Sequence, residues 1–110
     1  MPLLKITRTI KDVSGWDEET KAAVAGKSNG VVAELFPNGD YVWKTSVVAG
    51  PDTLVCYHDA SDEAAVRAHS KAGGFPVDSV EEVGAIDMKG ALWTMGPENA
   101  QTTEMARAAE

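Results

Sequence analysis

The sequence has little cysteine, few basic residues and no long apolar run. A single cysteine, Cys56, excludes an internal disulfide, so nothing in the chain requires an oxidising compartment. Asp and Glu number 17 against 10 Lys and Arg, and the resulting net charge of -7 repels phosphate backbones. No apolar run approaches the roughly 20 residues that span a bilayer, and the first ten residues do not resemble a signal peptide. We therefore predict a cytoplasmic protein that binds neither nucleic acid nor membrane.

Length and composition are those of one globular domain. A chain of 110 residues, 44% of them hydrophobic, buries roughly 65% of its unfolded surface when it folds. We place the domain at residues 1–88 and a C-terminal extension at residues 89–110. The extension alternates like a strand only at residues 91–95. From Pro97 on, it is either a short helix to Ala109 or a mobile tail.

The hydrophobic pattern predicts four strands and two helices. The strands are expected at residues 2–10, 41–49, 53–58 and 79–87. A first helix follows a capping box of Ser14 and Asp17 and runs to about Phe36. A second helix, capped by Ser61, ends at about residue 72, where two glycines allow a left-handed exit and Pro76 prevents continuation.

This order, βαββαβ, predicts an α+β, ferredoxin-like fold. Only three residues, 50–52, separate the second and third strands, and so short a connection permits only an antiparallel hairpin. Two helices on one face of a four-stranded antiparallel sheet leave the other face bare. A second copy covers that face most simply, as a dimeric α/β barrel about a two-fold axis, although a ligand or the C-terminal extension could cover it instead. We predict a homodimer.

Both histidines and the cysteine are candidate reactive side chains. Cys56 and His58 lie two apart in a predicted strand, so they point to the same side. His69 shares a helical stripe with Val66 that faces the protein interior. Such side chains bind a metal or act as a general base, or they are buried structural residues. Spacing alone favours the structural interpretation, because two ligands do not make a metal site.

Trp43 and Thr45 are alternate residues of a predicted strand, so we expect them on one side of it. If Trp43 faces the bare surface of the sheet, it forms either the floor of an apolar pocket or part of a dimer core. The adjacent Glu81 and Glu82 point to opposite faces of a strand and cannot act as paired carboxylates. Hydrolase and nucleotide-binding functions have no positive support.

Three runs resemble a family of small bacterial proteins of formally unknown function, some of whose members are labelled nickel-binding. These runs are DASDEAAVRAHSKAGGFPVDSVEEV, AGKSNGVVAEL and YVWKTSV, and the resemblance covers most of residues 3–87. It is most specific from Ala68 and His69 to Pro76. The resemblance implies a ferredoxin-like protomer that pairs into a dimeric α/β barrel, in agreement with the pattern of strands and helices.

The resemblance also implies a set of polar side chains at the family's site. Cys56, His69 and Glu82 match the family pattern. Where that pattern has Glu, Cys, His and Tyr, this chain has, in the same order, Thr7, Asn29, Thr45 and His58. Loss of a thiolate and an imidazole removes soft ligands that favour nickel or zinc. The remaining metal ligands are His58, His69 and Glu82, with Cys56 as a fourth, for nickel or another divalent transition metal.

Two functional hypotheses follow, beside a structural dimer that binds nothing. The first is a small dimeric binding protein whose cavity between two sheets takes a transition-metal ion or a small molecule. Its ligand pocket is formed by Trp43, Thr45, Asn29 and Thr7. The second is a cofactor-independent monooxygenase, isomerase or cyclase on the same barrel, with His69 or His58 as the catalytic base.

Overall fold

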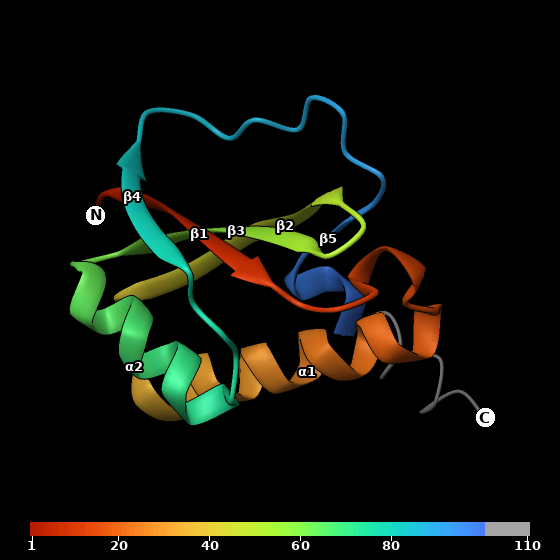
Figure 1. The fold of residues 1–110 in the computed structure, drawn as a ribbon. Helices are drawn as coiled ribbons and strands as arrows, with labels where there is room; N and C mark the ends of the chain where they lie inside the picture. The colour runs from red at the N-terminus through yellow and green to blue at the C-terminus, as the bar shows by residue number, and fades with distance from the viewer. Residues whose placement is uncertain (101–110) are drawn as a thin grey trace.

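Five strands form one antiparallel sheet, and two α-helices lie on one of its faces (Figure 1). A computed structural model describes residues 1–100 of the chain. The strands are β1 (Leu3–Thr9), β2 (Tyr41–Gly50), β3 (Thr53–Ala60), β4 (Ser79–Val83) and β5 (Thr94–Met95). The helices are α1 (Glu18–Leu35) and α2 (Glu63–Gly73), and a single 3-10 turn, η1 (Val13–Gly15), precedes α1. Strand order in the sheet is β4-β1-β3-β2-β5.

The α+β class and the element order βαββαβ are confirmed. The order β4-β1-β3-β2 is that of the predicted ferredoxin-like plan, and the β2–β3 hairpin is antiparallel as expected. The sheet differs by having a fifth strand, β5, which pairs with the free edge of β2. β4 is also shorter than predicted. It ends at Val83, which pairs with Leu3, the first residue of β1, so the strand has no partner beyond that point.

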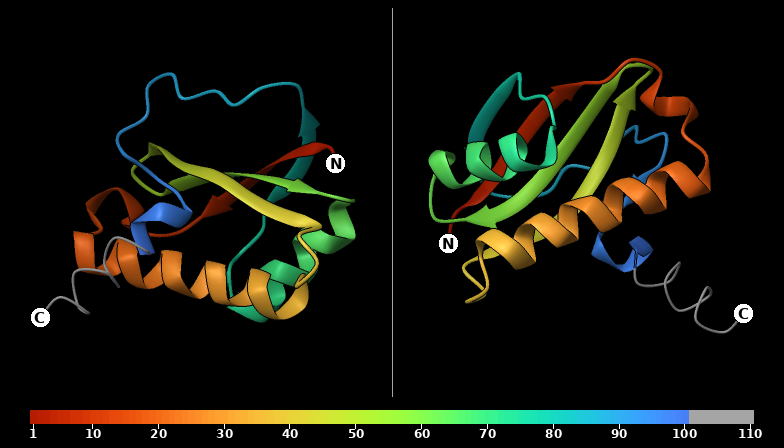
Figure 2. Two further views of the ribbon diagram at one scale, coloured as in Figure 1. Left: turned by 180° about the vertical axis from the view of Figure 1, so that it is seen from behind. Right: turned by 90° about the horizontal axis from the view of Figure 1, so that it is seen from below.

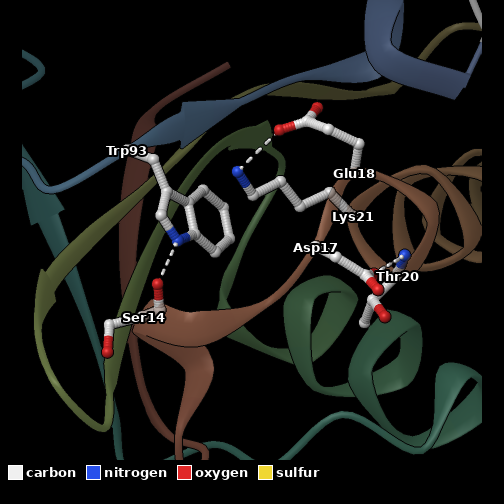
Figure 3. A network of polar contacts seen from close by, with 6 residues as sticks. All are labelled: Ser14, Asp17, Glu18, Thr20, Lys21 and Trp93. Carbon is white, nitrogen blue, oxygen red and sulfur yellow. Dashed lines mark hydrogen bonds and ion pairs between the residues drawn. The ribbon is translucent and has the colours of Figure 1, made fainter.

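Both helices are capped at the N-terminus by an aspartate. The side chains of Asp17 and Asp62 accept hydrogen bonds, at 2.8 and 2.9 Å, from the amide three residues later (Figure 3 for Asp17). The predicted caps at Ser14 and Ser61 are therefore wrong, because a carboxylate nearer the helix satisfies the amide and also carries a charge suited to the positive end of the dipole. Gly74 (φ 72°) gives the left-handed exit of α2, as predicted. Within residues 1–100, no helix has the length and apolar character needed to span a membrane.

The hydrophobic core lies between the sheet and the helices, which share one face in both views of Figure 2. Alternation in β1 directs Leu4, Ile6 and Arg8 toward the helices, and all three are buried. Full burial of a side chain such as Ile6 stabilises the fold by about 2 kcal/mol. The inward position of Arg8 thus places a positive charge beside the hydrophobic core.

A β-bulge in β2 separates two residues that were expected on one side. Trp43 pairs with His58, whereas Thr45 pairs with the adjacent residue of β3, Tyr57, so Lys44 is an extra residue on β2. Paired residues of antiparallel strands point to the same face, and the faces of His58 and Tyr57 are opposite. Trp43 therefore faces the helices and Thr45 the other side. The expectation that they share a side is wrong, because the bulge inverts the alternation between them.

The face of the sheet away from the helices is crossed by residues 84–92, which we call the crossing segment (Figure 1). Val47, Val55 and Tyr57 are buried on this face, and Ile86 of the crossing segment packs against them. The Tyr57 hydroxyl also lies 3.3 Å from the backbone nitrogen of Asp87, which donates to it. The face expected to be bare is therefore partly covered by the chain itself. The homodimer stays a prediction.

The segment that follows returns to the start of α1. The indole nitrogen of Trp93 donates to the carbonyl of Ser14 at 3.2 Å, and Lys21 Nζ lies 4.6 Å from the centre of the Trp93 ring (Figure 3). Met95 is buried beyond it, and residues 97–100 form a helical turn that begins at Pro97, as one of the two expectations had it. Its predicted continuation to residue 109 lies outside the described residues.

Candidate functional site

A cavity of about 330 Å³ lies between the sheet and the two helices, and we call it the sheet–helix cavity. Its apolar wall includes Ile10, Trp16, Val24, Trp43, Leu54 and Met95. Its polar lining includes Arg8, Ser28, Ser46, Cys56, His58 and His69. The cavity is thus on the helix side of the sheet and inside one chain, whereas the predicted cavity lies between the sheets of two copies.

Arg8 is the charged group of the cavity wall that is most deeply buried, with 2% of its surface exposed. Its Nη1 donates to Ser70 Oγ at 3.0 Å and to the Pro76 carbonyl at 2.8 Å, and its guanidinium lies 5.5 Å from the Phe75 ring centre. Nε points to Cys56 Sγ at 3.4 Å. All these partners are neutral groups or a sulfur. Among residues 1–100, no carboxylate forms an ion pair with Arg8.

The Cys56 sulfur accepts two hydrogen bonds. An indole nitrogen can only donate, so Trp43 Nε1 donates to Ser46 Oγ at 3.0 Å. The Ser46 hydroxyl donates to Cys56 Sγ, also at 3.0 Å, and the guanidinium of Arg8 can only donate. A chain of donors thus converges on the sulfur from two sides. Cys56 and His58 share this wall, as their spacing predicted.

The His58 ring is held by a hydrogen bond with the Tyr41 side chain. The Tyr41 hydroxyl bonds to His58 Nδ1, and burial raises the pKa of Tyr41, so the phenol stays protonated and can donate. Burial holds the pKa of His58 well below 6.5, and the charges of His69 and Arg8 lower this pKa further. With the phenol as donor, the ring proton of the neutral imidazole is on Nε2.

His69 lies in a stack of rings above the same wall. It is 1% exposed, between Tyr41 (centroids 5.2 Å apart) and Phe75 (5.5 Å). Burial, reinforced by the charge of Arg8 and opposed by a hydrogen bond with the Ser28 backbone, lowers the pKa of His69 to about 4. Its Nε2 lies 3.1 Å from Ser28 Oγ, and its Nδ1 has no hydrogen-bond partner among residues 1–100. Both histidines are neutral at pH 7.

Four other predicted site residues do not line this cavity. Thr7 points to the opposite face of β1, and Thr45 is on that same face of the sheet. The side chains of Asn29 and Thr45 donate to backbone carbonyls of the C-terminal segment, at 3.1 and 3.2 Å. Glu82 is exposed on the edge strand β4. Of the predicted pocket residues, the structure places only Trp43 at the cavity.

The predicted metal ligands are only partly brought together. Cys56, His58 and His69 share the cavity wall, whereas Glu82 does not. Within residues 1–100, no group of three or more His, Cys, Asp or Glu side chains is arranged to hold a metal ion. In addition, the guanidinium of Arg8 lies beside the sulfur, and a fixed positive charge repels a cation. As arranged here, these side chains do not form a ready-made nickel site.

Arg8 is the site residue that the sequence prediction missed. The signal was present, because Arg8 occupies an inward position of the alternating strand that also holds Leu4 and Ile6. A charged residue at an apolar position of the pattern indicates a site that needs the charge.

A family model described as nickel responsive protein SCO4226-like matches residues 6–83. The chain belongs to this family. The resemblance to a nickel-labelled family of small domains is thereby confirmed, and the matched range runs from β1 to the end of β4. Searches of curated proteins and of solved structures gave no significant match. The family description connects the chain with nickel. The ligand that this chain binds has to be inferred from the geometry of the cavity.

Proposed function

We propose that this protein binds a small, largely apolar molecule in the sheet–helix cavity. The observation that carries the proposal is the cavity itself. Its volume of about 330 Å³ is within the range of about 300–1,000 Å³ typical of ligand pockets. Protein interiors are otherwise packed as densely as organic crystals, so a space of this size beside the core of a 110-residue chain is unusual.

The lining supports an apolar ligand with one polar end. Trp16 and Trp43 provide large apolar surfaces, and the indole nitrogen of Trp43 is already bonded to Ser46. Polar groups gather around Arg8, Cys56 and the two histidines. A few polar groups in an apolar pocket fix the orientation of a ligand and give specificity.

A fluorescence titration tests the proposal. The neutral apolar dye N-phenyl-1-naphthylamine should bind with increased emission, and it should quench the protein's tryptophans, because two of them line the cavity. Val24→Phe fills the cavity and should weaken dye binding, whereas Val42→Phe, at an exposed position of β2, should not. Equal binding to both variants, or no binding to the wild type, would contradict the proposal.

Nickel binding is a second candidate, which the family match favours. Cys56, His58 and His69 are the donors that share a wall, and all three are of a type that suits nickel. Binding would require Arg8 to move away from the sulfur. Titration of nickel into untagged wild type and His69→Ala decides the matter. Stoichiometric, histidine-dependent binding supports the candidate, and no binding to the wild type removes it.

The two histidines do not favour the enzyme alternative. A general base works best when its pKa lies near the working pH, and the pKa of His69 is about 4. Both rings are also engaged, with Tyr41 and with Ser28. Binding is therefore the function that this geometry supports best.

The homodimer is a separate proposal, supported by the resemblance to dimeric α/β barrels. The contact would form over the crossing segment, whose Met88 and Leu92 are 48% and 61% exposed. Two large apolar side chains exposed on one segment are consistent with a partner surface.

A further inference from the structure

We infer that the ligand of the sheet–helix cavity is an organic anion, an apolar body with a carboxylate that Arg8 binds. The inference rests on the proposed function and names the chemical class of its ligand. It follows from the charge of the cavity wall, from the state of Arg8 and from the surrounding donors.

The wall of the cavity contains cations and neutral groups. Arg8 and Lys27 are the positively charged side chains that line it. The sequence has 17 acidic residues against 10 basic ones, yet none of the acidic residues in the described part of the chain lines the cavity. Two cations without a carboxylate beside them make the cavity wall locally positive, and this favours an anionic ligand over a cationic one.

Arg8 lacks the partner that a buried cation normally has. Buried charges are almost always paired with an opposite charge or bound to a metal, because desolvation of an isolated ion is costly. The partners of Arg8 are the Ser70 hydroxyl, a backbone carbonyl and the Cys56 sulfur. Its Nη2 forms no hydrogen bond within residues 1–100. That group remains available to a carboxylate, which guanidinium binds with strong, charge-assisted hydrogen bonds.

A second unpartnered donor or acceptor lies in the same wall. Nδ1 of His69, in a ring that is 1% exposed, has no hydrogen-bond partner in the described chain. An unsatisfied buried polar atom is rare in native proteins. Nδ1 is fully buried, so it is not itself a contact of the ligand, but it shows that the chain leaves polar groups unsatisfied on this side of the cavity. Arg8 and His69 are bridged by Phe75, whose ring contacts both, so the two unpartnered groups belong to one side of the cavity.

The alternative counter-ion is the Cys56 sulfur itself. As a thiolate it would neutralise Arg8 and leave no reason for an anionic ligand. We favour the ligand, because Nε is the only nitrogen of Arg8 that points to the sulfur, at 3.4 Å, and Nη2 remains without a partner in the described residues. The experiment separates these two sources of negative charge.

Three ligands with one chain length test the inference. Octanoate, octanol and octylammonium displace N-phenyl-1-naphthylamine from the wild type in competition titrations at pH 7.5. Octanoate should bind at least about tenfold more tightly than octanol, as expected for a hydrogen bond to a charged group, and octylammonium more weakly than either. Arg8→Met should remove the preference for octanoate. The control Arg67→Met removes an exposed arginine of α2 and should keep it.

Each outcome has one meaning. Equal affinity of octanoate and octanol for the wild type overturns the inference and leaves the proposed function intact, whereas displacement by none of the three contradicts the proposed function. A preference that survives Arg8→Met, or that appears only in Cys56→Ala, also overturns the inference, the latter because it identifies the thiolate as the counter-ion. If Arg8→Met does not fold by circular dichroism, the comparison of the three ligands on the wild type decides, since they differ in head group and share one apolar chain.

Discussion

Acidification should destabilise this protein through His69. The imidazole is buried and faces Arg8 of β1, His58 of β3 and Tyr41 of β2, none of which offers a negative charge. Its pKa falls from 6.5 to about 4 on folding, so the unfolded chain binds the proton more readily. The stabilisation is therefore complete above about pH 6.5 and is lost as the pH falls through the window down to about 4.

The size of the effect follows from the shift. Between about pH 7.5 and pH 4.5, a group with these two pKa values lowers the free energy of unfolding by about 2.5 kcal/mol. His58 adds to the loss in the same direction, because its pKa is also well below 6.5. For a domain of this size, with a urea slope of about 1–1.5 kcal/mol/M, the loss from His69 alone lowers the urea midpoint by about 2 M.

Urea unfolding followed by far-UV circular dichroism at both pH values measures this loss. His69→Phe keeps the ring stack with Tyr41 and removes the titration, at a cost of about 1 kcal/mol for the Ser28 hydroxyl, which is the same at both pH values. The difference between wild type and variant isolates His69 from the carboxylates, which titrate in both proteins. Equal loss of stability in the two proteins would refute the assignment of a neutral, buried imidazole.

Three further changes test the helix cap, the cavity wall and the dimer. Asp62→Ala should cost about 1 kcal/mol in urea unfolding, whereas Ser61→Ala should cost nearly nothing, and the reverse order would restore the serine cap. Gly73→Ala places a methyl group 2.3 Å from a ring carbon of Phe75 and should therefore displace that ring. The variant should be less stable by about 1–3 kcal/mol and should bind the dye more weakly. A variant with wild-type stability and dye affinity would contradict this packing. Light scattering should give a mass twice that of the 11.6 kDa chain, and Leu92→Lys should halve it; a monomeric wild type would exclude the dimer.

Local chemistry explains why the fold could be predicted. The alternation of β1, the tight turn after β2 and the glycine exit of α2 depend on neighbours in the sequence, and the structure has all three, with a turn one residue shorter than predicted. The errors at Ser14 and Ser61 are also local. In each case an aspartate one to three residues later is an equally good cap and starts the helix at a different residue, and sequence patterns do not rank two such caps.

The candidate site was predicted less well, because its members come from distant parts of the chain. Burial of His69 and the common side of Cys56 and His58 followed from periodicity, and all three residues line the cavity. The side of Trp43 depended on a bulge at Lys44, which pairing with β3 creates and which no residue pattern in β2 announces.

The sequence by itself determined four of the five strands, the two helices and the inward direction of Arg8, Cys56 and His69, since periodicity and turn residues act over a few positions. Only the tertiary structure decided that these three side chains line one cavity on the helix side of the sheet, together with Trp43. It also decided that the opposite face is crossed by residues 84–92 and that no acid lies beside Arg8 within the described chain. The physical reason is the same in each case, because contacts between different strands, helices and loops depend on packing and strand register and not on neighbours in the sequence.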